Sequence, residues 1–305
     1  MPSFRFLLLL SALWLLGACQ ETEYQPKLKL EQGKTYYQQA KQRNIIIQEM
    51  QEMPVEVSLK SESELSFLVK AIEDGLYVLE TQYAKISLAM DMPDGEKMNF
   101  NSSEDDGELV SALLAEMVGQ TFEVRMNRQG EVKSIEGLRF LIQQSINKFP
   151  ELRFEQREQV KAQIEETFGP LSLRDQLQQH TVIFPQKKVK PEEEWDLDKS
   201  IFVGVPAEVS MTYQLQKIVE HAYIIKGNGT MSVATTTPKE EQSPVLAYDL
   251  KGEISANLTI SRRSGWIKQA EIVHHFKGKA NLSSSNANGN SIPIQMKAQI
   301  NVSGS

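Results

Sequence analysis

Strict alternation between apolar and polar residues over long stretches constrains this chain more than any other feature. Every second residue is apolar from about 207 to 219 and from 250 to 261, and the residues between are polar. The same period runs through 266–277 and 292–302. Because neighbouring side chains on a strand point to opposite faces, this pattern indicates strands with one buried and one solvated face. We therefore expect a mainly β (α+β) protein of large, curved antiparallel sheets, with an open half-barrel as one form they could take.

The first half of the chain shows the same period, interrupted by turn signals. Alternation is clear within 55–71 and 76–92, and an Asp-Gly pair follows each of these stretches, at 74–75 and 94–95. Asp-Gly pairs favour tight turns between antiparallel strands. A further hairpin is expected over 121–137, where a polar turn ending in glycine separates two short alternating runs.

Two stretches change to a helical period. Apolar residues recur every three or four positions within 104–118, behind acidic residues suited to a helix N-terminus, and this pattern predicts a helix. A longer stretch from 138 to 180 is helical in pattern and rich in Gln and Glu, with breaks expected at Pro150 and at Gly169-Pro170. We expect these helices to cover the sheets.

A passage with prolines and clustered charges divides the chain. Two prolines and three lysines lie within 184–191, and three glutamates follow at 192–194. Such composition is typical of connections between structural units. We place the boundary here, between an N-terminal β-rich half with the helices, residues 33–190, and a C-terminal antiparallel β half, residues 191–305.

Glycine and small polar residues mark the turns and loops of the C-terminal half. Gly227-Asn228-Gly229 and Ser264-Gly265 are expected turns. Residues 235–243 and 283–290 are expected to be exposed loops, because nearly all of their side chains are polar or small.

The N-terminus carries the pattern of an export signal. One arginine precedes an apolar run over 6–16, which is shorter than the roughly 20 residues that cross a bilayer, and two small residues follow it. The sequence Leu-Gly-Ala-Cys at 16–19 resembles the lipobox of bacterial lipoproteins, whose cysteine becomes the first mature residue and is acylated. Residues 1–18 are therefore expected to be a signal peptide, cleaved between Ala18 and Cys19, with Cys19 as the site of lipidation.

Cys19 is the single cysteine of the chain, which excludes an intramolecular disulfide. The alternative interpretation is a buried small residue or a free thiol. Residues 20–27 are polar, so 19–32 are expected to form an acylated, flexible tether that holds a water-soluble body at a membrane. Gln20 follows the cysteine where aspartate is associated with inner-membrane retention in some bacteria, so the resemblance favours the outer membrane.

The charge balance limits the partners. The chain holds 33 basic and 40 acidic side chains, a formal net charge of −7 at pH 7. An acidic protein repels phosphate backbones and anionic lipid surfaces. This balance argues against nucleic acid as a partner and against electrostatic docking on a membrane.

Side chains typical of catalytic and metal sites are sparse. The chain lacks both a Gly-x-Ser-x-Gly elbow and a Gly-rich phosphate loop. Its four histidines are His180, His221, His274 and His275. Because His274 and His275 are adjacent on an expected strand, they point to opposite faces and cannot jointly hold one metal. We expect no catalytic residues, no metal and no cofactor.

Two clusters of acidic residues leave an alternative open. Asp105-Asp106 and Glu192 to Glu194 could serve as calcium ligands or as the carboxylate pair of a glycosidase. The simpler interpretation is a helix N-terminal pair in the first case and a solvated charge run in the second. We therefore expect a protein that is not an enzyme, with a hydrolase as the less favoured alternative.

Long strands with one apolar face must cover that face, and curved strands can enclose a pocket as well as a core. Methionines, whose side chains adapt to irregular shapes, add to this apolar inventory. They are Met90, Met92, Met98, Met211, Met231 and Met296. A solidly filled core is the alternative, and the helical stretch 138–180 could either cover a pocket or pack directly on the sheet.

Several spaced features together resemble an uncharacterised family of bacterial envelope lipoproteins with a domain of unknown function. They are the lipobox, Gly33-x-x-Tyr36, the hairpin 121–137, the passage 184–195, and the strands around Tyr213 and Gly252. This resemblance covers most of the chain and implies no catalytic residues. More remotely, a tethered β-rich body with helices between strands is similar to the open half-barrels that carry lipids or lipoproteins across the periplasm.

The expected function is therefore that of a non-enzymatic lipoprotein of the bacterial cell envelope. We expect it to be anchored through Cys19, with the outer membrane favoured, and to bind a hydrophobic ligand or another envelope component. A structural or interaction protein without a ligand cavity is the alternative.

Overall fold

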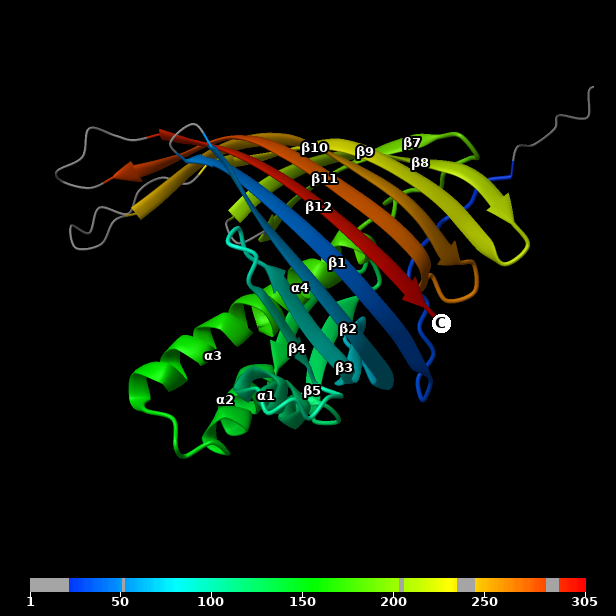
Figure 1. Ribbon diagram of the computed structural model, residues 1–305. Helices are drawn as coiled ribbons and strands as arrows, with labels where there is room; N and C mark the ends of the chain where they lie inside the picture. The colour runs from blue at the N-terminus through cyan, green and yellow to red at the C-terminus, as the bar shows by residue number, and fades with distance from the viewer. Residues whose placement is uncertain (1–21, 51–52, 203–205, 235–244, 284–290) are drawn as a thin grey trace, which may run out of the picture.

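The computed structural model describes residues 22–50, 53–202, 206–234, 245–283 and 291–305. One strongly curved antiparallel sheet dominates it, and helices lie on one side of that sheet (Figure 1). The predicted fold class, mainly β with a curved antiparallel sheet and covering helices, is confirmed. The predictions for 1–18, Cys19, 235–243 and 284–290 fall outside the described residues.

In the described part of the chain the sheet has twelve strands. They are β1 (Thr35–Met50), β2 (Met53–Glu73), β3 (Leu76–Asp91), β4 (Lys97–Asn101), β5 (Thr121–Asn127), β6 (Val132–Glu136), β7 (Glu194–Phe202), β8 (Pro206–Val219), β9 (Ala222–Ala234), β10 (Val245–Ser261), β11 (Ile267–Ser283) and β12 (Ser291–Gly304). Their order is β6-β5-β3-β2-β1-β12-β11-β10-β9-β8-β7, with β4 paired to β3 off this path. Because β6 and β7 stand at opposite ends of the order, the sheet is open.

The helices are α1 (Leu109–Met117), α2 (Leu138–Asn147), α3 (Phe154–Phe168) and α4 (Pro170–Thr181). Among the residues described, none of these combines the length and the hydropathy that a bilayer-crossing helix needs. All of them follow β4 in the chain and precede β7, and the β5–β6 hairpin lies between α1 and α2, so the helical layer comes from the middle of the chain.

The two halves of the chain share the sheet. The first and last strands pair at its middle, from Gln38 opposite Gly304 to Gln48 opposite Ile294. The predicted boundary passage at 184–194 leads from the helical layer to β7, which is an edge strand. The passage 184–194 therefore connects the helical layer to an edge strand of the sheet. The strands of the two halves of the chain belong to the same sheet, because β1 and β12 are hydrogen-bonded to each other.

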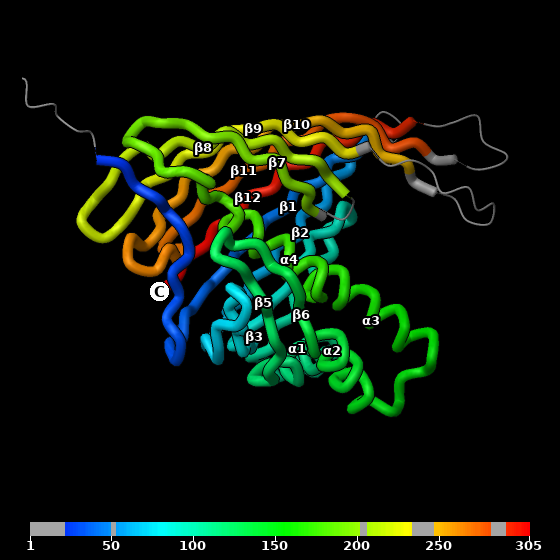
Figure 2. The backbone as a smooth tube through the Cα atoms, turned by 180° about the vertical axis from the view of Figure 1, so that it is seen from behind, coloured from blue at the N-terminus to red at the C-terminus, as the bar shows by residue number. Residues whose placement is uncertain are grey.

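Alternation in the sequence determines which side of the sheet is covered. In β8, for example, Val209, Met211 and Tyr213 are buried, and the residues between them are exposed. The apolar side faces the helices and forms the concave side of the sheet (Figures 1 and 2). The polar side forms the outer face.

Most of the predicted turns lie where the sequence placed them. Asp74 (φ 50°) and Gly75 (φ 80°) join β2 to β3, and two residues with positive φ are what a two-residue type I′ hairpin turn requires. The turns at 94–95, 127–130 and 264–265 also lie between strands. These predictions are confirmed.

The predicted turn at Gly227-Asn228-Gly229 is wrong, because these residues lie inside β9 and the chain turns earlier, at 220–221. The glycines have a packing role instead. A Cβ atom on Gly227 would lie 2.7 Å from a ring carbon of Tyr213, and one on Gly229 would lie 2.6 Å from the sulfur of Met211. The bare backbone of β9 therefore makes room for the large side chains of β8.

The prediction for the first helix needs a correction. The first helix begins at Leu109 rather than at 104. Gly107 has a φ of 78°, which is not helical, and Asp106 holds a turn just before the helix. The carboxylate of Asp106 accepts hydrogen bonds from the Glu108 amide at 2.9 Å and from the Ser111 hydroxyl at 2.8 Å. The stretch 138–180 forms three helices, and its two breaks lie at Pro150 and at Gly169-Pro170, where the sequence predicted them.

The tether predicted over 19–32 differs in its described part. Leu28 and Leu30 are 1% and 4% exposed, so this segment is packed rather than flexible. The Leu28 amide donates to a carbonyl of the β5–β6 turn at 3.1 Å, and the Lys29 amide donates to a carbonyl of the β10–β11 turn at 2.7 Å. We call residues 24–33 the strap, because they tie these two turns together. The polar composition of residues 20–27 led to the prediction of a flexible tether, whereas buried Leu28 and Leu30 fix the strap on the body of the protein.

Candidate functional site on the concave side

The concave side is filled at the end next to the strap, which we call the proximal end. Trp266 is 2% exposed there, and its ring centroid lies 5.4 Å from that of Tyr36 and 5.2 Å from that of Phe67. Its indole N–H donates to a backbone carbonyl of β1 at 3.0 Å. The hydroxyl of Tyr77 donates to the carbonyl of Leu28 in the strap at 3.1 Å. Aromatic packing and the strap therefore close this end.

At the opposite, distal end, apolar side chains remain half-buried on the concave side. We call them the distal patch: Ile46, Tyr248, Ile292 and Met296. Ile46 is paired directly with Met296 across β1 and β12, and Ala280 of β11 is paired with both Ile292 and Tyr248. The ends of β10, β11 and β12 run beyond α4 here (Figures 1 and 2). The distal patch is thus a continuous apolar surface across four neighbouring strands.

Between the two ends, α4 meets the sheet through polar side chains, which we call the polar seam. The Nε2 atom of His180 lies 2.9 Å from Oε1 of Gln38 on β1. Among the residues described, Oε1 of Gln179 and Nε2 of His274 are buried without a hydrogen-bond partner. A buried polar atom without a partner costs roughly 1–3 kcal/mol of folding free energy. The seam is therefore a weak part of the contact between α4 and the sheet.

A small hollow lies beside the polar seam. Its volume is about 10 Å³, and it is lined by Gln42 and Ser61 from the sheet and by Gln176 and His180 from α4, among others. That space is close to the minimum that one water molecule requires. In this closed arrangement the seam holds no room for a larger ligand.

Lys199 of β7 points to the concave side, because it shares the parity of the buried residues Trp195 and Ile201. Its ammonium donates to the carbonyls of Gln178 at 3.2 Å and Gln179 at 3.4 Å, in the last turn of α4. Helix C-terminal carbonyls lack intrahelical partners and carry partial negative charge, so this cation caps α4. Part of the Lys199 side chain remains accessible, yet the surrounding protein lowers the pKa of its ammonium to about 8 by desolvation.

The two buried histidines are uncharged at neutral pH. Burial, together with the nearby positive charge of Lys199, lowers the pKa of His180 to about 3 and that of His274 to about 4. The seam therefore offers neutral hydrogen-bonding groups and one cation between two apolar regions.

The histidines that the sequence singled out are not brought together as a site. His274 is buried on the concave side and His275 is exposed on the outer face, which confirms the prediction that they point apart. His221 is 77% exposed by side chain in the β8–β9 turn. In the described residues, histidine, cysteine and carboxylate side chains do not gather in threes that could hold a metal ion.

The acidic clusters have local roles. Asp106 organises the turn before α1, close to the role predicted for it. Glu193 accepts a hydrogen bond from the Lys190 amide at 2.8 Å and forms an ion pair with Lys187 at 3.3 Å. These contacts leave Asp106 and Glu193 in different parts of the fold, the first before α1 and the second before β7.

Sequence reasoning missed three residues of the seam: Gln38, Gln179 and Lys199. A signal existed for Lys199, since it continues the every-second-residue pattern of Trp195, Leu197 and Ile201. Similarly, His274 lies between Ile272 and Phe276 on the apolar face of its strand. A polar residue at a position where the alternation expects an apolar one would have predicted that Lys199 and His274 lie on the covered face of the sheet.

None of the curated proteins matches this chain. The solved structure described as "Lipid-protein interactions in lipovitellin" is similar over 89% of this chain and 25% of that chain, with 11% identity and a TM-score of 0.44. This chain thus spans about a quarter of the length of that lipovitellin chain. The family model described as "Family of unknown function (DUF6263)" matches residues 74–267, which include the hairpin 121–137 and the passage 184–195. The chain therefore belongs to this family of unknown function, and the resemblance to an uncharacterised family is confirmed.

Proposed function

We propose that this protein is a lipid-anchored protein of the bacterial outer membrane that binds a hydrophobic ligand on its concave side and catalyses no reaction. The distal patch is the observation that carries the ligand proposal. Apolar surface left in water costs roughly 25 cal/mol per Å², and the four side chains of the distal patch keep part of their apolar surface in water next to one another. A ligand that covers the patch recovers that free energy.

A lipid acyl chain suits this surface better than a protein partner. Four half-buried side chains expose far less than the roughly 800 Å² per partner that a stable protein interface buries. The patch lies on the inner side of a curved sheet, where a narrow chain is surrounded more completely than a flat surface could be. Met296, with its flexible thioether, adapts to chains of different shape.

The helix α4 provides a way to enlarge the site. Part of its contact with the sheet runs through the polar seam, where Gln179 and His274 lack partners. Leu173 and Leu177 of the same helix, by contrast, are buried in the core. Separating the seam alone therefore costs less than moving the whole helix, which would also expose these two leucines. Separation at the seam would uncover the floor next to the distal patch and lengthen the space for a ligand.

The decisive test extracts lipids from a soluble form that lacks residues 1–19, followed by mass spectrometry of the extract. We expect a bound lipid in the unaltered protein, and its loss from Met296→Asp. The matched control is Gln295→Asp, which changes the neighbouring residue of β12 on the exposed outer face and should keep the lipid. An extract without lipid from the unaltered protein would contradict the proposal.

The tether is a separate part of the proposal and rests on the lipobox-like sequence ending at Cys19. Radiolabelled palmitate added to the producing bacteria should label the protein, and Cys19→Ser should remove both the label and the membrane association. An unlabelled protein that still begins at Met1 would refute the anchor and leave the distal patch to be tested on its own.

A second candidate is an interaction protein that docks another envelope protein through its helices. Phe140 on α2 is 68% exposed and Phe154 on α3 is 76% exposed, and exposed aromatic side chains are frequent anchors of protein interfaces. If Phe140→Ser and Phe154→Ser abolish co-purification of a partner while Met296→Asp leaves it unchanged, this candidate is favoured.

A further inference from the structure

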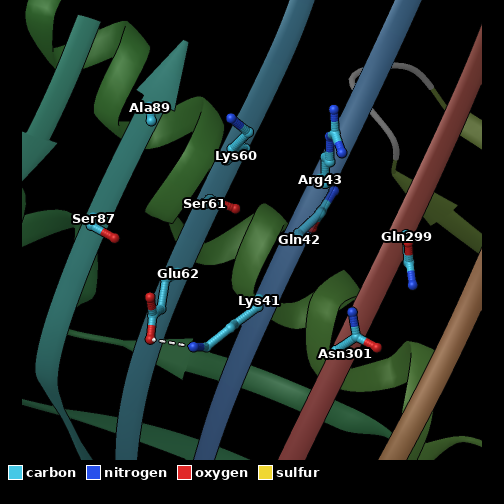
Figure 3. A pocket seen from close by; sticks show the side chains of 10 residues that line it. All are labelled: Lys41, Gln42, Arg43, Lys60, Ser61, Glu62, Ser87, Ala89, Gln299 and Asn301. Atoms are coloured by element: carbon cyan, nitrogen blue, oxygen red, sulfur yellow. Dashed lines mark ion pairs between the residues drawn. The ribbon is translucent and has the colours of Figure 1, made fainter. Parts of the chain in front are cut away.

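A second hollow lies on the outer face, on the side of the sheet away from the helices (Figure 3). It measures about 330 Å³ and is formed by four neighbouring strands, β3, β2, β1 and β12. The residues that give it its character are Lys41, Arg43, Lys60, Glu62, Gln299 and Asn301. It is far larger than the hollow beside the polar seam, and charged and amide side chains surround it.

The strand register arranges these side chains in two rows across the sheet. In one row Arg43 of β1 lies between Lys60 of β2 and Gln299 of β12. In the next row, two residues along β1, a lysine lies between Glu62 and Asn301. Figure 3 shows the glutamate and the lysine of this second row pointing toward each other, and their charged atoms are 3.4 Å apart. The second row is therefore neutralised internally.

The first row is not neutralised in the same way. Arg43 and Lys60 face each other directly, and like charges in that position repel. The ammonium of Lys60 forms an ion pair with Asp91 at 3.0 Å, at the far side from Arg43. No carboxylate in the described part of the chain forms an ion pair with Arg43. Asp91, which is already paired with Lys60, lies near enough for the charge of Arg43 to lower its pKa as well, so Arg43 and Lys60 together keep one positive charge in excess of it.

The donors of the first row fit an oxyanion. A guanidinium presents two parallel N–H groups that match two oxygens of a phosphate, and an ammonium adds a point charge. The amide of Gln299, on the opposite side of Arg43 from Lys60, donates one N–H to Glu271 at 3.4 Å and has a second N–H to offer. An anion held between these groups would also remove the repulsion between Arg43 and Lys60.

We infer that this outer-face hollow binds a phosphate group, held by Arg43, Lys60 and Gln299. The phosphate comes either from a free phosphate monoester or inorganic phosphate, or from the headgroup of an anionic phospholipid. The carboxylate of Glu62 marks the end of the hollow that the phosphate avoids. This site lies on the opposite side of the sheet from the distal patch, so its test does not depend on whether the proposed function is correct.

The first experiment measures thermal unfolding of the full exported protein in detergent, with sodium phosphate added against sodium chloride of equal ionic strength. Phosphate should raise the Tm in a saturable way, and the affinity should fall at least tenfold in Arg43→Gln and in Lys60→Gln. The matched control is Lys277→Gln, because Lys277 also faces a lysine, Lys251, across a strand pair on the outer face but lies outside the hollow. A shift that is equal in all variants, or equal with chloride, would overturn the inference.

The second experiment separates the two sources of phosphate. The Cys19→Ser protein is mixed with phosphatidylcholine vesicles that contain or lack phosphatidic acid, and sedimented. Recruitment that requires phosphatidic acid and is lost in Arg43→Gln assigns a lipid headgroup. A phosphate-dependent Tm shift without recruitment assigns a soluble phosphate. The absence of both, or recruitment that Arg43→Gln leaves unchanged, refutes the site.

Discussion

The two ends of the concave side are built from the same strands and differ in what covers them. Tyr36 and Ile46 lie on the same face of β1, yet Tyr36 is 7% exposed beside Trp266, whereas Ile46 is half-buried at the distal end. The strap and an aromatic cluster close the proximal end, and the strands run past α4 at the distal end. The apolar period of a strand thus specifies which face is inward, while the covering segments decide whether that face is core or binding surface.

The largest expected effect is at the proximal end. Trp266→Ala should lower the free energy of unfolding by about 3–5 kcal/mol, because it removes a fully buried aromatic ring and leaves a cavity. Urea unfolding followed by circular dichroism measures this change. If Trp266→Ala costs less than Met296→Ala, the proximal end is not the filled end and the comparison fails.

The polar seam between the two ends predicts a pH dependence. The folded-state pKa values of His180 and His274 lie below the unfolded value of about 6.5, so only the unfolded state takes up protons as the pH falls below 6.5. Stability should therefore drop from pH 7 to pH 5, by about 2 kcal/mol for each buried histidine. Urea unfolding at the two pH values measures the drop.

His180→Gln combined with His274→Gln should flatten this pH profile between pH 6.5 and pH 5. The exposed His221→Gln is the control and should leave the profile unchanged. Carboxylates such as Asp91, whose pKa is lowered chiefly by its hydrogen bond to Lys60, lose their contribution at lower pH, outside this window. A profile that stays steep in the double variant would assign the acid sensitivity to other groups.

A smaller effect is expected where the floor of the sheet is filled. Gly227→Ala should destabilise the fold by about 1–3 kcal/mol, because its new methyl group meets the ring of Tyr213 and overpacks the floor. Gly229→Ala should behave similarly, since its methyl group meets Met211 and the Ser210 carbonyl. Thermal unfolding of both variants tests whether this region is close-packed. An unchanged Tm would indicate free space beside the glycines.

The smallest stability change is expected at the distal patch. Met296→Ser should cost less than about 1.5 kcal/mol, because its side chain is already half in water. Its lipid content, measured by mass spectrometry of extracts, should nevertheless fall several-fold. A large loss of stability together with unchanged lipid content would show that Met296 belongs to the core.

Much of the fold could be predicted from the sequence, because alternation and Asp-Gly pairs act locally. The strands of the C-terminal half and the turn at Asp74-Gly75 follow directly from such patterns. Gly227 and Gly229 misled the prediction, since a glycine that yields space to Tyr213 on a neighbouring strand has the same local signature as a turn. Contacts across strands are not visible in a local pattern.

The candidate site was less predictable for the same reason. Whether Ile46 is core or binding surface depends on where α4 ends in space, and the sequence does not give that. Lys199 carried a usable signal in its parity with Trp195, but its partners in the last turn of α4 are known only from the fold. The strap was hidden because Leu28 and Leu30 lie among charged residues.

Photo-cross-linking with a diazirine-bearing fatty acid tests the central claim most directly. The probe is bound to the purified protein, irradiated, and its attachment sites are mapped by peptide mass spectrometry. The account predicts attachment to peptides that contain Ile46, Tyr248, Ile292 or Met296, and a loss of attachment in Met296→Asp. Attachment confined to the exposed helices around Phe140 and Phe154, or none at all, would contradict it.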